Sequence, residues 1–90
     1  MGSIIVVIKV LPSGIDVDLE KLKDEIRKQL PVGTSAKAFD VKPVAFGLNA
    51  LYVYISMPDN YEGGTTKVEE AISSIPGVEQ VDVEFISLEH

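Results

Sequence analysis

The sequence has no cysteine and no tryptophan, and its only histidine is the final residue, His90. A chain without cysteine can form neither a disulfide framework nor a thiolate metal site. Nucleophilic catalysis relies on serine, cysteine and histidine in defined pairs, and this chain offers almost nothing for those roles. We therefore expect a protein that is not an enzyme, with no metal site and no cofactor.

Long apolar segments are also missing. The longest uninterrupted aliphatic run has five residues, Ile4 to Ile8, whereas a membrane-spanning helix needs about 20. The N-terminus lacks the basic region and the small-residue cleavage site of a signal peptide. With 46% hydrophobic and 24% charged residues the chain is of the globular type. These features predict a cytoplasmic protein that makes no membrane contact.

The final three residues, Leu88-Glu89-His90, have the composition of a vector-derived linker that leads into a histidine tag. We expect residues 88–90 to be such an expression-tag remnant and exclude them from functional reasoning. Residues 1–87 have the length of one small domain, and we expect a single domain there.

Basic side chains are scarce in the second half of the chain. Residues 1–45 carry seven basic and six acidic groups, whereas residues 46–90 carry Lys67 alone against eight acidic groups, and the net charge is −6. General nucleic-acid binders need lysine and arginine to displace counterions from phosphates, so this balance argues against that class. The uneven charge either orients a protein partner during encounter or serves solubility alone.

The first half of the chain has the pattern of a strand, a helix and a second strand. Residues 3–11 are rich in β-branched residues and apolar on both faces, which predicts a central strand. A helix follows, capped by Asp16 or Asp18 and ended by a Pro-Val-Gly segment. Residues 34–43 form a weaker strand, and Pro43 places its end at a sheet edge or a bulge because proline lacks the amide donor.

The second half repeats this layout in the order strand, helix, strand. Apolar residues alternate with polar ones over 48–57, as in a half-buried strand. Thr66 and Glu69 have the spacing of a capping box, which predicts a helix from there to about Ile75. The last strand is expected to carry three apolar side chains on one face: Val81, Val83 and Phe85.

The resulting order is βαββαβ. It predicts a ferredoxin-like α+β sandwich, in which two helices cover one face of a four-stranded antiparallel sheet. This fold hosts many functions, so the fold alone assigns none. Tyr52 and Tyr54 would lie on the open sheet face, where RNA-recognition domains stack bases, and an RNA-binding module is therefore the alternative function. A small-ligand sensor that dimerises side by side also stays open.

The segment 43–51, Pro-Val-Ala-Phe-Gly-Leu-Asn-Ala-Leu, is not explained by generic strand chemistry. Its Phe46-Gly47 pair puts a large apolar ring at a surface turn. The ring either tucks under the sheet edge or anchors another protein, and residue physics alone leaves both interpretations open.

With this segment as its most specific part, the sequence resembles the archaeal elongation factor 1-beta family. The likeness covers nearly the whole chain. It extends to four further segments, Ile8-Lys9-Val10-Leu11-Pro12, Asp16-Val17-Asp18-Leu19, Glu62-Gly63-Gly64-Thr65 and Ile75-Pro76-Gly77-Val78-Glu79.

The resemblance implies a guanine-nucleotide exchange factor that promotes GDP release and GTP rebinding on translation elongation factor 1-alpha. We expect the protein to be monomeric alone and to touch no nucleic acid directly. The residues expected to bind the GTPase are Pro43, Phe46, Gly47, Leu48 and Asn49 at the turn, with Ile86 and Ser87 at the tail. Eukaryotic relatives carry a lysine at the chain end that intrudes near the magnesium site of the GTPase. This sequence has no lysine or arginine after Lys67.

Overall fold

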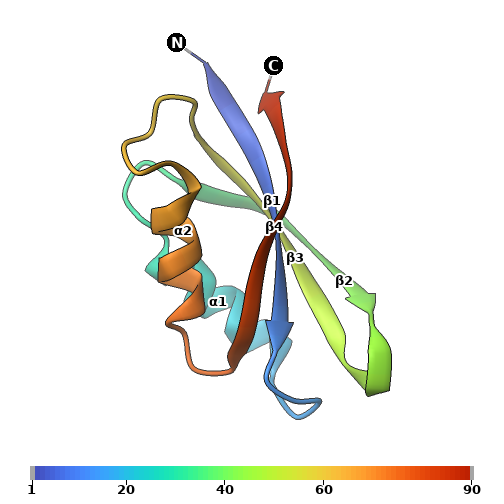
Figure 1. The fold of residues 1–90 in the computed structure, drawn as a ribbon. Helices are drawn as coiled ribbons and strands as arrows, with labels where there is room; N and C mark the ends of the chain where they lie inside the picture. The colour runs from blue at the N-terminus through green and yellow to red at the C-terminus, as the bar shows by residue number, and fades with distance from the viewer. Residues whose placement is uncertain (1, 90) are drawn as a thin grey trace.

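In the computed structural model, which describes residues 2–89, the chain folds into one four-stranded sheet and two α-helices (Figure 1). A short 3₁₀ turn, η1 (Ala45–Gly47), connects the second and third strands. In chain order the other elements are β1 (Ser3–Pro12), α1 (Leu19–Gln29), β2 (Ser35–Pro43), β3 (Asn49–Pro58), α2 (Gly64–Ser73) and β4 (Val78–Glu89).

The sheet has the strand order β2-β3-β1-β4, and all three pairings are antiparallel. Both helices cover the same face (Figure 1). The predicted ferredoxin-like α+β fold is therefore confirmed. The central position of β1 follows from its two apolar faces, and β2 is an edge strand, as the position of Pro43 indicated.

The hydrophobic core lies between the helices and the sheet. Alternate residues of β1 and β3 form the sheet side of the core, and one apolar face of each helix forms the other side. No polar or charged side chain is buried within residues 2–88. The buried core residues are Val6, Ile8, Val10, Leu22, Ile26, Leu51, Val53, Ile55, Met57, Val68, Ile72 and Ile75.

Helix α1 begins as its sequence predicts. The carboxylate Oδ1 of Asp18 accepts hydrogen bonds from the backbone amides of Glu20, at 3.0 Å, and Lys21, at 3.3 Å. These bonds satisfy two amides that have no partner inside the helix. Asp18, and not Asp16, is therefore the N-cap.

The capping box predicted for α2 is wrong. The helix begins at Gly64, two residues before Thr66, and Gly63 occupies the cap position without a side-chain hydrogen bond. Gly63 and Gly64 both have positive φ, 88° and 56°, which lets the chain turn into the helix early. Glu69 instead accepts a hydrogen bond from the hydroxyl of Thr65 at 3.0 Å.

The expected alternation along β4 is also wrong. Val83 pairs with Ile8 on the helix-covered face, but Phe85 pairs with Val7, whose side chain lies on the open face. An irregularity between these pairs inserts Glu84 as an extra residue, and one extra residue reverses the faces that follow. Phe85 therefore lies on the open face, 59% exposed.

The two chain ends lie at the same end of the sheet, opposite the β2–β3 turn (Figure 1). Ser3 pairs with Glu89, and Ile4 pairs with Leu88. The domain boundary expected at residue 87 thus falls inside β4, while His90 lies outside the described residues. Neither helix within residues 2–89 has both the length and the apolar character needed to cross a membrane.

Candidate partner-binding site

The β2–β3 turn is closed by its own backbone. The amide of Val44 donates to the carbonyl of Leu48 at 2.8 Å, and the amide of Leu48 donates to the carbonyl of Ala45 at 3.2 Å. Directly below the turn, Pro43 pairs with Asn49 as the last pair of the β2–β3 ladder. These contacts hold the tip of the hairpin in one conformation.

Phe46, at the tip of the turn, has an unusual backbone and an unusual environment. Its φ of 60° and ψ of 33° are left-handed, and no other non-glycine residue among 2–89 has a positive φ. A left-handed backbone costs an L-residue about 1–2 kcal/mol. The side chain recovers nothing by burial, because it is 96% exposed. Folding stability therefore does not explain a phenylalanine at this position.

The structure brings most of the predicted site together. Five of the seven predicted residues lie at the β2–β3 end of the sheet: Pro43, Phe46, Gly47, Leu48 and Asn49. Ile86 and Ser87 lie within β4, where they pair with Val6 and Ile5 of β1. They are close to the chain ends and thus at the other end of the sheet (Figure 1). The turn and the tail are therefore apart, and within the tail Ile86 lies on the helix-covered face whereas Ser87 lies on the open face.

The open sheet face carries more aromatic surface than the sequence indicated. Tyr52 and Tyr54 lie on it as expected, and Phe85 joins them around a shallow hollow. Sequence reasoning missed Phe85 because the β4 irregularity has no local signature. The ammonium of Lys42 lies 5.0 Å from the centre of the Tyr52 ring, within the range of a cation–π contact.

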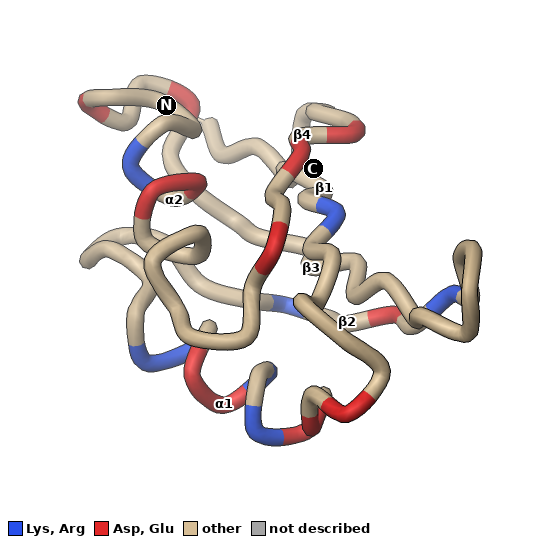
Figure 2. The backbone as a smooth tube through the Cα atoms, turned by 60° about the horizontal axis from the view of Figure 1, so that its bottom comes forward, with Lys and Arg blue, Asp and Glu red and all other residues tan. Residues whose placement is uncertain are grey.

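Charge is distributed unevenly over the elements. Figure 2 shows acidic positions along α2 and β4, whereas basic positions lie mainly on α1, β1 and β2. On α1, three basic residues pair with acidic neighbours one turn away, at 2.8, 3.0 and 3.9 Å. These pairs are largely exposed and contribute little to stability. The acidic side formed by α2 and β4 has only Lys67 to offset it.

Among the side chains of residues 2–88, no three acidic ones lie close enough to hold a metal ion. The distinctive features are surfaces: an exposed, left-handed aromatic turn, an aromatic sheet face and an acidic side. Fold and surface together define a small ferredoxin-like α+β domain suited to contact with a partner.

Comparison with known proteins assigns the family. Residues 5–88 match the family described as the EF-1 guanine nucleotide exchange domain, and the chain belongs to this family. It is 49% identical over 86 residues to elongation factor 1-beta of Staphylothermus marinus, covering 96% of each chain. It is 47% identical over 83 residues to elongation factor 1-beta of Metallosphaera sedula, covering 92% of this chain and 91% of the relative. Family membership supports a nucleotide-exchange role in translation elongation.

Proposed function

We propose that this protein is a guanine-nucleotide exchange factor that acts on translation elongation factor 1-alpha in the cytoplasm. It promotes release of GDP so that GTP can bind and a new elongation cycle can begin. The observation that carries this proposal is the family match over residues 5–88. The exposed, rigid turn at Phe46 supports it, because it offers a preformed contact for a protein partner.

The mechanism needs no covalent step. If binding of this protein lowers the affinity of the GTPase for GDP by some factor, bound GDP must lower the affinity of the GTPase for this protein by the same factor. The exchange factor therefore has to prefer the open, nucleotide-free form of the GTPase, and its contacts stabilise that form until GTP displaces it. Surface contacts that fit only the open form are sufficient for this function.

The turn is the anchor in this mechanism. Phe46 is already exposed before binding, and the backbone bonds at Val44 and Leu48 already fix the turn. A preformed anchor loses little conformational entropy when it binds, so more of its contact energy appears as affinity. Aromatic residues that enter a partner pocket are typical hot spots of this kind.

The tail provides the second contact at the other end of the domain. Ile86 is aligned, through β1, with Ile55 of β3. Asn49 lies six residues earlier on β3, about 20 Å away at the rise of an extended strand. One GTPase that touches both ends must therefore lie along the length of the sheet. In this proposal Ile86 and Ser87 contribute a steric contact to the GTPase.

RNA binding by the open face is the competing function. Tyr52, Tyr54 and Phe85 would be the stacking platform. The same face has Asp82 and Glu84 on β4 beside Lys9 and Lys42, so it lacks the excess of positive charge that binding to RNA phosphates needs. We therefore favour the protein partner.

Linkage gives a direct binding test. Isothermal titration of this protein into elongation factor 1-alpha should show tight 1:1 binding when the GTPase is stripped of nucleotide. Excess GDP should weaken that binding by a large factor, because the two bind antagonistically. Equal affinity with and without GDP would contradict an exchange role.

A further inference from the structure

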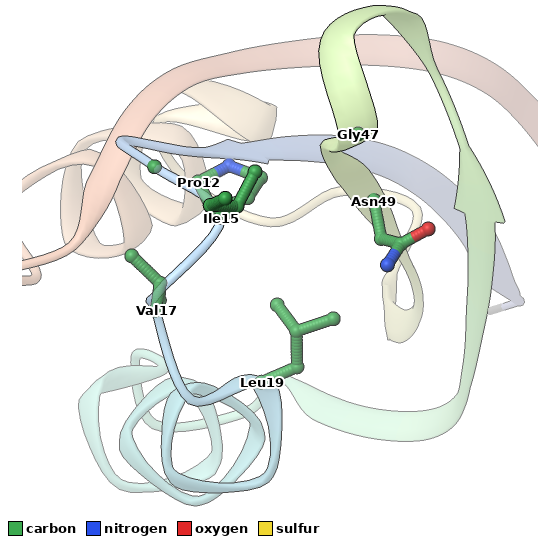
Figure 3. A pocket seen from close by; sticks show the side chains of 7 residues that line it. Pro12, Ile15, Val17, Leu19, Gly47 and Asn49 are labelled. Carbon is green, nitrogen blue, oxygen red and sulfur yellow. The ribbon is translucent and has the colours of Figure 1, made fainter.

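We propose, building on the exchange function above, that a hollow beside the Phe46 turn is a further part of the GTPase-binding surface. It takes an aliphatic side chain of the GTPase that is flanked by a lysine or arginine. The hollow lies between the β1–α1 loop and the β2–β3 turn (Figure 3). It is lined by Pro12, Gly14, Ile15, Val17, Leu19, Gly47 and Asn49.

The hollow is continuous with the proposed anchor. A Cβ placed on Gly47 would lie 3.7 Å from Cγ2 of Ile15, so the loop and the turn are in van der Waals range. Ile15 is 75% exposed and Phe46 is 96% exposed. Single exposed apolar residues are ordinary, but two of them on adjacent loops around a hollow form a patch of the kind that binds proteins.

The size of the hollow selects the side chain that fits. Its volume is about 70 Å³, roughly half that of a cavity known to admit benzene, about 150 Å³. The branched end of a leucine, isoleucine or valine matches this volume more closely than an aromatic ring does. Leu19 and Asn49 extend into the space between the loop and the turn (Figure 3).

Asn49 adds a polar contact at the rim. Its carboxamide makes no hydrogen bond with another residue in the described part of the chain. An amide side chain offers both donors and an acceptor, which suits the backbone of an incoming segment. The aliphatic side chain would thus enter the hollow while its own main chain bonds to Asn49.

The surrounding charge selects the flanking residue. Between Lys9 and Lys21 the chain has no basic residue but three acidic ones, Asp16, Asp18 and Glu20. Asp18 caps α1, and Glu20 pairs with Lys23 at 2.8 Å. Asp16 is next to Ile15 and makes no ion pair within residues 2–89. A lysine or arginine beside the bound aliphatic residue would form an ion pair with Asp16.

The test compares four variants of the full chain for binding to nucleotide-free elongation factor 1-alpha. Ile15→Ala should weaken affinity about tenfold, as expected for an interface residue that contributes less than a hot spot. Asn49→Ala should weaken it severalfold, and Asp16→Lys should slow association at low salt. The matched control is Val32→Ala, because Val32 is 96% exposed but lies in the loop before β2, beside Tyr61, and β2 is the sheet edge opposite β4 with Ile86 and Ser87. Melting curves check that every variant is folded.

The outcomes separate this inference from the proposed function. If the unsubstituted protein binds and Ile15→Ala and Asn49→Ala both behave like Val32→Ala, the hollow is not part of the interface, and the exchange function stands. If the unsubstituted protein itself fails to bind the GTPase, both are overturned. A loss confined to the Ile15, Asn49 and Asp16 variants supports the hollow as a binding site.

Discussion

Truncating Phe46 to alanine should separate binding from folding. The side chain is 96% exposed, so its removal creates no cavity and loses no core contact. Alanine must adopt the same left-handed backbone, so the strain of the turn remains. We expect the free energy of unfolding to change by less than about 0.5 kcal/mol, as for other surface substitutions.

The same change should greatly weaken the complex with the GTPase. Loss of an aromatic hot spot costs roughly 2 kcal/mol or more of binding energy, which is about thirtyfold in affinity. Urea unfolding of the isolated protein would report stability, and titration of GDP release against protein concentration would report activity. Unfolding and exchange should respond very differently.

Two control variants sharpen the result. Val32→Ala removes an equally exposed apolar side chain in the loop before β2 and should change neither measurement. Phe39→Ala removes a partly buried ring that packs on the core and lies 4.7 Å from the Arg27 guanidinium. It should lower stability by about 1–3 kcal/mol, less than a fully buried phenylalanine. If Phe46→Ala instead lost 3 kcal/mol of stability at unchanged activity per folded molecule, Phe46 would be a structural residue and the anchor hypothesis would be refuted.

Three further outcomes are expected. Gly63→Ala should lower stability by about 1–2 kcal/mol in urea unfolding, because φ is 88° and the new Cβ would lie 3.0 Å from Lys67; an unchanged midpoint would contradict this. Association with the GTPase in stopped flow should slow as salt rises from about 50 to 500 mM, with dissociation little changed, if the acidic side steers encounter; a salt-independent rate would leave recognition to the turn. Fluorescent single-stranded RNA should not bind saturably at physiological salt, and binding lost on Tyr52→Ala or Tyr54→Ala would favour the RNA alternative.

The elements that could be predicted from sequence are those encoded locally. The two apolar faces of β1 required a central strand, and Asp18 carried its own capping signal. The alternation of β3 placed Tyr52 and Tyr54 on the open face. In each case the physical cause lies within a few residues of its effect.

What the sequence did not predict depends on tertiary register or on glycine conformation. The extra residue at Glu84 is visible only in the pairing of β4 with β1. The sequence near Phe85 therefore gave no sign that its side chain lies on the open face. Gly63 started α2 through its positive φ, where the Thr66 motif indicated a later start. The backbone conformation of the turn decides whether the Phe46 ring is buried or exposed, and the sequence alone does not give that conformation.

The most direct measurement of the central claim is the release of a fluorescent GDP analogue from elongation factor 1-alpha, followed after addition of excess unlabelled GDP. Release should accelerate severalfold or more when this protein is present well below the GTPase concentration, because one exchange factor serves many GTPase molecules in turn. Val32→Ala should match the unsubstituted protein, and Phe46→Ala should be severely impaired. No acceleration, even with this protein in stoichiometric excess, would contradict the exchange function while leaving the fold intact.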